Sequence, residues 1–539
     1  MLADWPILSL VAFSPLIGIG IILLMHNDAG RWIRLTAVLA SLIPLVLSAW
    51  LYADFDNEAG TMQYHEEVNW IRIDLNRETG TLPYFDDFYY EFNYEMAVDG
   101  LSMPLVFLTA LIGFMAVLAS VHVRKRWKLY YIQLLLLEIG MLGVFMAKDL
   151  FLFFLFFELA LIPSYYLIGI WGYKDREKAA NKFLIYNGVG SAVMLLAFLI
   201  LINTAGFSSP AAEDGRNILT YSGDIEVIAA NLTDNNAYAN MDPEEVGLNP
   251  FYMGPGLRWA VFIMLLVAFG IKLPFFPFHT WMLKVHTEAP TGMVMIHSGI
   301  MLKMGAYGLI RFGVQLFPDQ MQDWAAVLAV LGVINILYGA VLAFVQQEFK
   351  LILAYSSVSH MGIVLLGIAS MNEIGLQGAV FQMISHGLIA ALMFLIIGSL
   401  YERTGTSRID ELGGLAKAAP FLCGMLLASG FASLGLPGLS GFVSEFLSFL
   451  GLFGSMPWIA VIGAFGIVLT AAYVLRGVMR ITFGPMPQQY EGIREARLIE
   501  AVPIIVLFAF IVLLGVYPPV LGKTLQMTVQ NLVTTLLGG

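Results

Sequence analysis

The feature that most constrains this chain is a succession of about fourteen apolar stretches, each close to twenty residues long. A helix of roughly 20 apolar residues crosses a bilayer core of about 30 Å. The chain of 539 residues is 59% hydrophobic and 12% charged, a composition that a soluble domain cannot cover with polar side chains. We therefore predict an all-α polytopic membrane protein with a single integral membrane domain over residues 1–539.

The expected spans lie at approximately 5–25, 33–52, 100–121, 129–147, 150–171, 183–203, 258–279, 290–313, 324–345, 351–370, 375–400, 419–450, 457–479 and 498–518. Two segments, 54–99 and 203–257, are too polar to span and are expected outside the membrane. Cytoplasmic loops carry the excess of lysine and arginine. This rule places the N- and C-termini on the outer, periplasmic side, with the cation-rich segments 124–128, 174–182, 403–417 and 476–497 inside.

Composition also limits the chemistry. Cys423 is the only cysteine, so the chain forms no internal disulfide and offers no thiolate cage for an iron–sulfur cluster. No HExxH motif is present, and the histidines within the spans lack close ligand spacing, so no metal site is expected. The net charge of −11 argues against a nucleic-acid surface.

Prolines interrupt two of the predicted helices. Pro274 lies in the seventh stretch, in IKLPFFPF, and Pro437 lies in the twelfth, in GLPGLSGF. Proline removes a helical hydrogen bond, and lipid cannot satisfy the freed carbonyls, so such breaks occur where protein or a hydrated cavity supplies partners. The two breaks are five spans apart and therefore have opposite orientations, which is typical of an inverted-repeat transporter.

Several charged residues are expected near the centres of spans: Glu138, Glu158, Lys272, Lys303 and Glu445. A charge at a helix centre costs at least about 2.5–3.5 kcal/mol on insertion scales, so these side chains need partners or a water path. Two interpretations are open, namely ion pairs that hold helices together and a path for protons. Glu158 and Lys272 are predicted to act as a pair whose titrations are coupled.

Histidines extend this set. His360 and His386 each lie within a span, and imidazole titrates near neutral pH. Each is compatible with a packing role or with a proton relay from Lys303 to Glu445. His279 and His286 flank the segment after the first break and are compatible with proton uptake or with helix capping, whereas no pattern assigns a role to His297.

Five segments resemble the antiporter-like membrane subunits of respiratory complex I, the NADH:quinone oxidoreductase: FFELALIPSYYLIGIWG (156–172), FGIKLPFFPFHTWMLKVHTEAPT (269–291), GIMLKMGAYGLIRF (299–312), AYSSVSHMG (354–362) and ASLGLPGLSGFVSEF (432–446). The resemblance implies fourteen helices with two inverted five-helix repeats, helices 4–8 over 129–313 and helices 9–13 over 324–482. It also implies proton transfer through the family's matching residues Glu138, Glu158, Lys272, Lys303, His360, His386 and Glu445.

Glu445 in the twelfth span resembles the M type of subunit, also called chain 4, because the L and N types usually carry lysine there. The resemblance implies L- and N-type neighbours in a bacterial inner membrane. It also implies that NADH, FMN, iron–sulfur clusters and quinone bind elsewhere in the complex, with no cofactor and no catalytic redox residue on this chain. A subunit of a multisubunit Mrp-type cation/proton antiporter or of a membrane-bound hydrogenase is the alternative, and a stand-alone solute carrier is a third.

Overall fold

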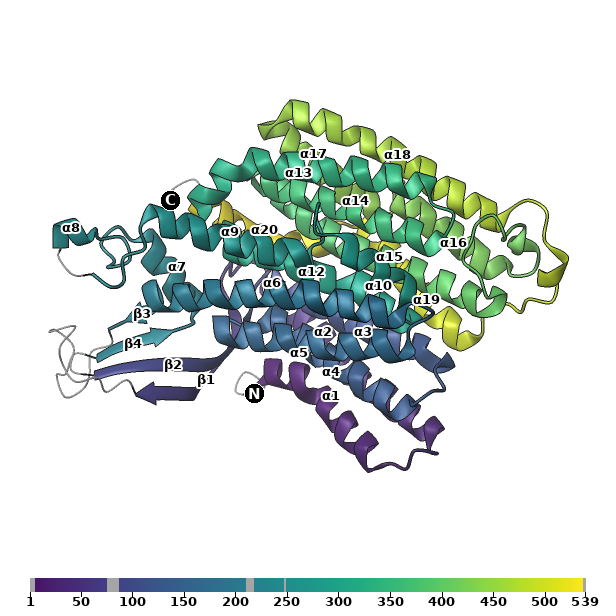
Figure 1. The fold of residues 1–539 in the computed structure, drawn as a ribbon, viewed down its shortest axis with the longest axis horizontal. Coiled ribbons are helices and arrows are strands. Elements are labelled where there is room, and N and C mark those ends of the chain that lie inside the picture. The colour runs from purple at the N-terminus through teal and green to yellow at the C-terminus, as the bar shows by residue number, and fades with distance from the viewer. Residues whose placement is uncertain (1–4, 75–86, 210–217, 247–248, 537–539) are drawn as a thin grey trace.

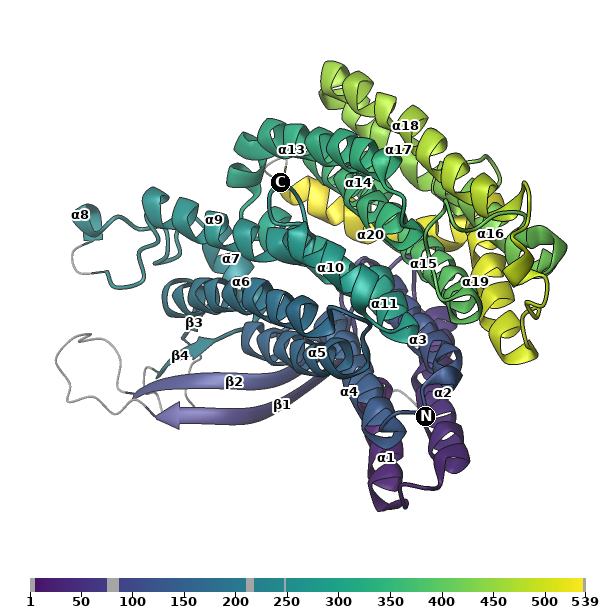
Figure 2. The ribbon, with the colours of Figure 1, turned by 45° about the vertical axis from the view of Figure 1, so that its right-hand side comes forward.

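The computed structural model describes residues 5–74, 87–209, 218–246 and 249–536. Within these residues, 13 helices are long and apolar enough to cross a membrane. They form one bundle with a small sheet at one end (Figures 1 and 2). The prediction of an all-α polytopic membrane protein is confirmed for the membrane part of the chain.

The unbroken membrane helices are α1 (Ile7–Leu24), α2 (Gly30–Asp54), α3 (Ser102–Ala119), α4 (Trp127–Met146), α5 (Leu150–Trp171), α6 (Arg176–Thr204), α13 (Pro318–Val345), α14 (Phe349–Ala369), α15 (Glu373–Thr404), α18 (Pro457–Thr482) and α19 (Leu498–Val516). The eighth crossing, Thr291–Val314, consists of α11 (Thr291–Ile296), η2 (His297–Met301), α12 (Leu302–Gly308) and η3 (Leu309–Val314). Its segments η2 and η3 are π-helical.

The first expected break separates α9 (Pro255–Lys272) from α10 (Thr280–Glu288), with Pro274 between them. Protein groups satisfy the backbone that the break frees. The indole nitrogen of Trp281 donates to the carbonyl oxygen of Ile271 at 3.1 Å, and the amide of Phe276 donates to Asn335 Oδ1 at 2.7 Å. The break is therefore tolerated because neighbouring side chains replace the lost helical partners.

The second expected break separates α16 (Pro420–Ser433) from α17 (Ser440–Ser455), with Pro437 between them. Neither half is long enough to cross alone, and the two together make the twelfth of the fourteen expected crossings. Gly435 and Gly438 adopt φ values of +75° and +93°, a region that side chains with a Cβ rarely enter. These glycines allow the chain to turn within the membrane.

The polar segments form a four-stranded sheet with the order β1-β2-β4-β3, built from β1 (Gln63–Asp74), β2 (Asp87–Val98), β3 (Phe207–Ser208) and β4 (Ile218–Ser222). β1 and β2 are antiparallel, whereas β2 and β4 are parallel. The sequence prediction contained no strands. The sheet depends on pairing between segments more than 120 residues apart, and the ring of Phe92 packs 4.6 Å from that of Phe151 at the start of α5.

The remaining elements are α7 (Ile225–Thr233), α8 (Pro243–Val246), α20 (Pro519–Leu536), η1 (Ser120–His122), η4 (Leu415–Lys417) and η5 (Gln488–Tyr490). α15 and the Thr291–Val314 crossing lie at the centre, and the most apolar window of each is wholly buried. α2 and α19 lie at the periphery, where exposed apolar side chains face the lipid region. The interior helices are therefore the ones that can carry charge.

Both ends of the described chain lie beside the sheet. The amide of Leu8 donates to Glu66 of β1 at 2.6 Å, and Asn531 of α20 donates to the carbonyl oxygen of Gly60 at 2.8 Å. The loops that precede α16 and α19 lie at the opposite end of the bundle (Figure 1). The two ends of the bundle therefore differ in charge: the end with the sheet is acidic, and the opposite end carries the cation-rich loops.

Candidate functional site

The centre of the site is a contact between Lys303 of α12 and His386 of α15. Lys303 Nζ lies 2.8 Å from His386 Nδ1 and also donates to the carbonyl oxygen of Ser298. Both side chains are buried, with exposed fractions of 0% for Lys303 and 5% for His386. A proton can therefore pass between the amine and the imidazole across one hydrogen bond.

His360 of α14 connects His386 to Glu445 of α17. The two imidazole centroids are 5.3 Å apart, and His360 Nδ1 lies 3.5 Å from Glu445 Oε1. Gln382 Nε2 lies 3.1 Å from the same nitrogen, and the Ser433 hydroxyl lies 3.4 Å from Nε2 of the ring. Lys303, His386, His360 and Glu445 thus form a continuous row across four helices.

The second break positions the far end of this row. A Cβ on Gly435 would lie 2.9 Å from Glu445 Oε2, so the carboxylate rests against the turn between α16 and α17. Ser433, the last residue of α16, also reaches His360. Both contacts depend on the interruption of the twelfth crossing, because a continuous helix would not leave room for the carboxylate there.

Lys272 and Glu158 lie at the other end of the set and do not form the direct ion pair that the sequence suggested. Lys272 is buried at the last turn of α9, and its Nζ has no hydrogen-bond partner. The amine lies 4.5 Å from the ring centroid of Phe157 and 6.0 Å from that of Phe183. Glu158 is half-buried and interacts with Lys272 through its charge alone.

Glu138 lies apart from the row. Both of its carboxylate oxygens are buried without a hydrogen-bond partner, and no ion pair involves it among the described residues. A Cβ on Gly113 of α3 would lie 3.0 Å from its Oε1. The small residue makes room for the carboxyl group between α3 and α4.

His286 and His297 join the buried set, although the sequence pattern assigned neither of them firmly. His286 Nε2 lies 2.9 Å from His297 Nδ1, and both side chains are fully buried. Their contact brings α10 together with η2, and no spacing in the sequence reports that packing. The sequence offered one signal, namely that His297 interrupts the otherwise apolar segment GMVMIHSG.

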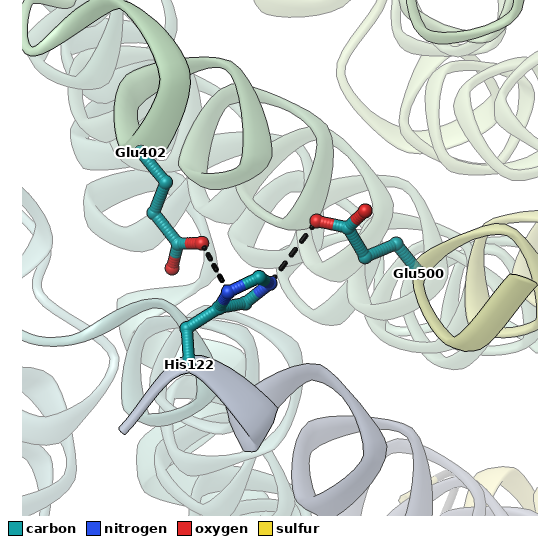
Figure 3. A group of neighbouring side chains, drawn as sticks. All are labelled: His122, Glu402 and Glu500. Carbon is teal, nitrogen blue, oxygen red and sulfur yellow. Dashed lines mark hydrogen bonds and ion pairs between the residues drawn. The ribbon is translucent and has the colours of Figure 1, made fainter. Parts of the chain in front are cut away.

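A separate polar cluster lies at the end of the bundle opposite the sheet. Figure 3 shows the imidazole of His122 between two carboxylates, with Nδ1 3.1 Å from Glu402 Oε2 and Nε2 3.1 Å from Glu500 Oε1. Donor atoms of these three residues lie within 4.8 Å of one another, a spacing that a metal ion could bridge. The two carboxylates, however, lie at different ring nitrogens, and one metal ion binds only one nitrogen of an imidazole.

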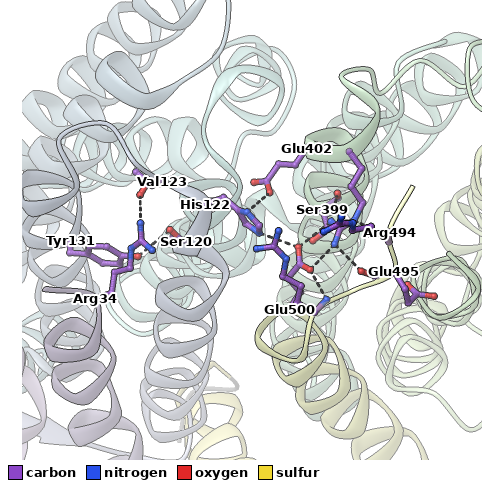
Figure 4. Close-up of polar contacts among 12 residues, drawn as sticks. Arg34, Ser120, His122, Val123, Tyr131, Ser399, Glu402, Arg494, Glu495 and Glu500 are labelled. Atoms are coloured by element: carbon purple, nitrogen blue, oxygen red, sulfur yellow. Dashed lines mark hydrogen bonds and ion pairs between the residues drawn. The ribbon is translucent and has the colours of Figure 1, made fainter. Parts of the chain in front are cut away.

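Arg403 completes this cluster. Its guanidinium donates to Glu500 Oε2 at 2.7 Å and Oε1 at 3.1 Å, and it also reaches the carbonyl oxygens of Ser399 and Arg494 (Figure 4). A bidentate arginine already neutralises the buried carboxylate. The arrangement is therefore an ion-pair network that ties η1 to α15 and α19 rather than a metal chelate.

At the sheet end, Asp149 caps the first turn of α5. Its Oδ1 accepts hydrogen bonds from the amides of Phe151 at 2.8 Å and Leu152 at 3.0 Å, whereas its Oδ2 is buried without a partner. Burial, and to a smaller extent the nearby carboxylates of Glu95 and Asp224, raise the pKa of Asp149 to about 7. The carboxyl group thus holds a proton in the folded protein that it releases near pH 4 when unfolded.

This shift predicts a pH-dependent stability. Because the folded state binds the proton more tightly, the folded protein loses stability as the pH rises from about 4 to about 7. Asp149→Asn keeps an oxygen for the cap and removes the titration, so we expect it to stabilise the protein by about 2 kcal/mol at pH 7 and by less near pH 5. Thermal unfolding of the purified complex at both pH values measures the difference, and parallel pH profiles for the two proteins would contradict it.

The fold and the row together define a class: a polytopic antiporter-like subunit with broken helices and a buried row of ionisable side chains. A family model for NADH:quinone oxidoreductase/Mrp antiporter transmembrane proteins matches residues 147–470, and one for the amino terminus of NADH-ubiquinone oxidoreductase chain 4 matches residues 79–148. The chain belongs to the chain 4 family of NAD(P)H-quinone oxidoreductases.

Individual relatives agree with this assignment. The chain is 37% identical to NAD(P)H-quinone oxidoreductase chain 4 2 of Thermosynechococcus vestitus, covering 98% of this chain and 92% of the relative. It is 39% identical to chain 4 1 of Synechococcus elongatus, covering 93% and 86%. A chain of respiratory complex I from Thermus thermophilus shares the fold at a TM-score of 0.80 with 28% identity, covering 99% and 100%. A chain of the Mrp complex from Dietzia sp. shares the fold at 0.77 with 20% identity, covering 98% of each.

Proposed function

We propose that this chain is the proton-translocating antiporter-like subunit of an NAD(P)H:quinone oxidoreductase, in which protons pass through its buried row while electrons flow in other subunits. The observation that carries the proposal is the contact sequence Lys303–His386–His360–Glu445, which runs across four helices inside the membrane region. Structural ion pairs alone do not explain this row, because Lys303 has a histidine rather than a carboxylate as its side-chain partner.

In this proposal Lys272 delivers protons to Lys303, the first member of the row, and Glu158 controls their release. The amine of Lys272 has no direct partner, and the charge of Glu158 helps to keep it protonated. Glu158 is half-buried on α5, so a charge on a neighbouring subunit can act on it. When Glu158 is neutralised or drawn toward such a charge, Lys272 loses electrostatic stabilisation and releases its proton toward Lys303.

Orientation and partners complete the proposal. The cation-rich loops before α16 and α19 face the cytoplasm, and the sheet and both termini face the periplasm of a bacterial inner membrane. The five-helix units 129–313 and 324–482 act as inverted halves that meet at the Lys303–His386 contact. L- and N-type subunits are the neighbours in the membrane.

The redox groups of the complex belong to other chains. NADH, FMN, iron–sulfur clusters and quinone perform the electron transfer, and this chain has a single cysteine, Cys423, which is buried in α16. One thiolate cannot hold an iron–sulfur cluster. This chain therefore contributes acid–base side chains, and the electron-transfer groups belong to other subunits.

Inverted membrane vesicles test the proposal against an Mrp-type function. We expect acidification of the vesicle interior on addition of NADH, abolished by a quinone-site inhibitor. An Mrp-type antiporter subunit would instead support sodium/proton exchange in the absence of an electron donor. Redox-independent exchange without NADH-driven acidification would overturn the proposal.

Lys272→Ala and Glu158→Gln test the input of the row. We expect each to lower the ratio of protons pumped to NADH oxidised by at least about fivefold, because a positioned acid or base contributes roughly 10²- to 10⁴-fold to a proton transfer. The ratio is measured from dye quenching and NADH absorbance in the same vesicles. Near-normal pumping by an assembled complex would remove both residues from the mechanism.

A further inference from the structure

No hydrogen bond joins Lys272 to Lys303, the first member of the row described above. The two side chains also share no hydrogen-bond partner. Both amines are buried, so a proton that leaves Lys272 needs a titratable group between them to reach Lys303. His286 and His297 are two buried titratable groups that lie in this region and contact each other.

His297 and Lys272 share an aromatic neighbour. The ring of Phe183 contacts both of them, with Lys272 Nζ and the His297 ring centroid each 6.0 Å from the Phe183 centroid. Trp281 packs 5.3 Å from the His297 ring, and its indole nitrogen donates to the carbonyl oxygen of Ile271, which precedes Lys272. The charges of both Lys272 and Lys303 act on His297.

His286 lies on the side of Lys303. The charge of Lys303 acts on His286. The His286 ring packs 5.0 Å from Phe394 of α15, the helix that also carries His386. The pair thus has His297 beside the Phe183 ring that also faces Lys272, and His286 beside the helix that carries His386, the partner of Lys303.

The hydrogen-bonding pattern leaves both ends of the histidine pair open. His286 Nε2 and His297 Nδ1 share one proton at 2.9 Å. The other two nitrogens, His297 Nε2 and His286 Nδ1, are buried without a partner. A buried polar atom without a partner is destabilising, which favours a role for these atoms beyond packing.

We propose that His297 and His286 together are the proton carrier between Lys272 and Lys303, an inference that rests on the proposed function. His297 Nε2 accepts a proton from the ammonium group of Lys272, and the proton on its Nδ1 moves to His286 Nε2. His286 then releases the proton on its Nδ1 toward the neutral amine of Lys303. One proton enters the pair and one leaves it. Each imidazole then carries its proton on the other nitrogen, so both rings must return to their starting tautomers before the next transfer.

The helix geometry at His297 supports this role. The crossing changes from α- to π-helical at His297–Met301, and single π-helical turns occur frequently at functional sites. Lys303 Nζ donates to the carbonyl oxygen of Ser298, the residue that follows His297, so the amine lies beside the π-helical turn. His286, supplied by α10, adds a second titratable ring at this turn through its contact with His297.

Three variants of the intact complex test the proposal. His297→Gln and His286→Gln keep the size and polarity of the site but cannot carry a proton, and Met295→Leu is the control because Met295 is equally buried on the same crossing. We expect each glutamine variant to lower the ratio of protons pumped to NADH oxidised by at least about fivefold relative to Met295→Leu. The double variant should be no worse than either single one, because both residues serve the same step.

Two results would overturn the proposal: control-level pumping by either glutamine variant, or additive losses in the double variant. If one variant fails to assemble into the complex, the other reports on the same step, since both break the same path. Lys303→Met separates the two claims. Loss of pumping with Lys303→Met but not with His297→Gln rejects only this inference, whereas normal pumping with Lys303→Met rejects the proposed function.

Discussion

Replacing Lys303 with methionine is expected to lower NADH-driven proton pumping at least about tenfold, since a positioned acid–base group contributes roughly 10²- to 10⁴-fold. Lys303 begins the row and contacts His386, with its amine 2.8 Å from the imidazole. Methionine fills a similar volume without charge. Removing a buried charge also relieves an insertion cost of at least about 2.5–3.5 kcal/mol, so the variant should fold.

Lys350→Met is the matched control for this experiment. Lys350 is also buried, but its amine lies 3.9 Å from the ring centroids of both Tyr173 and Tyr401, away from the row. Both variants remove one buried lysine from the membrane region. Pumping is measured per NADH oxidised in vesicles with equal amounts of complex. Equal ratios in the two variants would show that the Lys303 amine carries no proton.

Replacing Asp99 with alanine is expected to cost about 3–5 kcal/mol of stability, because it leaves the buried guanidinium of Arg311 without its partner. Arg311 forms an ion pair with Asp99 Oδ1, and both side chains are buried. The same oxygen accepts a hydrogen bond from the amide of Ser102 at 2.9 Å at the start of α3. The variant therefore loses an ion pair and a helix cap at once.

The pH dependence of this contribution follows from the charge of Asp99. Burial alone would raise the pKa of Asp99. The positive charge of Arg311 and its hydrogen bond outweigh burial, and the hydrogen bonds from Ser102 act in the same direction, so the pKa of Asp99 lies below its usual value. The stabilisation is fully present above pH 4 and is lost only as the pH falls through this lowered pKa.

A double variant distinguishes the ion pair from other effects of the substitution. Asp99→Ala combined with Arg311→Met removes both charges, and replacement of a buried pair by apolar groups is often close to neutral. We expect the double variant to recover most of the stability that Asp99→Ala loses, as measured by thermal unfolding of the purified complex at pH 7. A double variant no more stable than Asp99→Ala would assign the loss to the helix cap instead.

The sequence predicted the membrane crossings well because each follows from a local property. A run of apolar residues long enough to span defines a helix by itself, and proline in such a run defines a break wherever it occurs. The fourteen crossings and both interruptions, near Pro274 and Pro437, are therefore present as predicted. The sheet was not predicted, because its central strands β2 and β4 come from two distant acidic or polar segments, so their pairing is not a local property of either segment.

The sequence identified the members of the site but not which of them contact one another. Charge inside an apolar helix is visible in the sequence, which is why Lys303, His360, His386 and Glu445 could be named. Their order of contact could not be read from the sequence. Glu158 and Lys272 were expected to pair but do not touch, and His297 gave no clear signal because its partner, His286, lies on a different helical segment.

The amino-acid sequence alone determined that this chain lies in lipid, how often it crosses, where two crossings break and which side chains are too polar to be there by chance. These properties follow from the hydrophobicity and backbone chemistry of neighbouring residues. Only the tertiary structure decided which buried groups contact one another, since hydrogen bonds of about 3 Å depend on how the helices pack and turn. That packing joins Lys303 to Glu445 and leaves His297 and His286 between the two lysines.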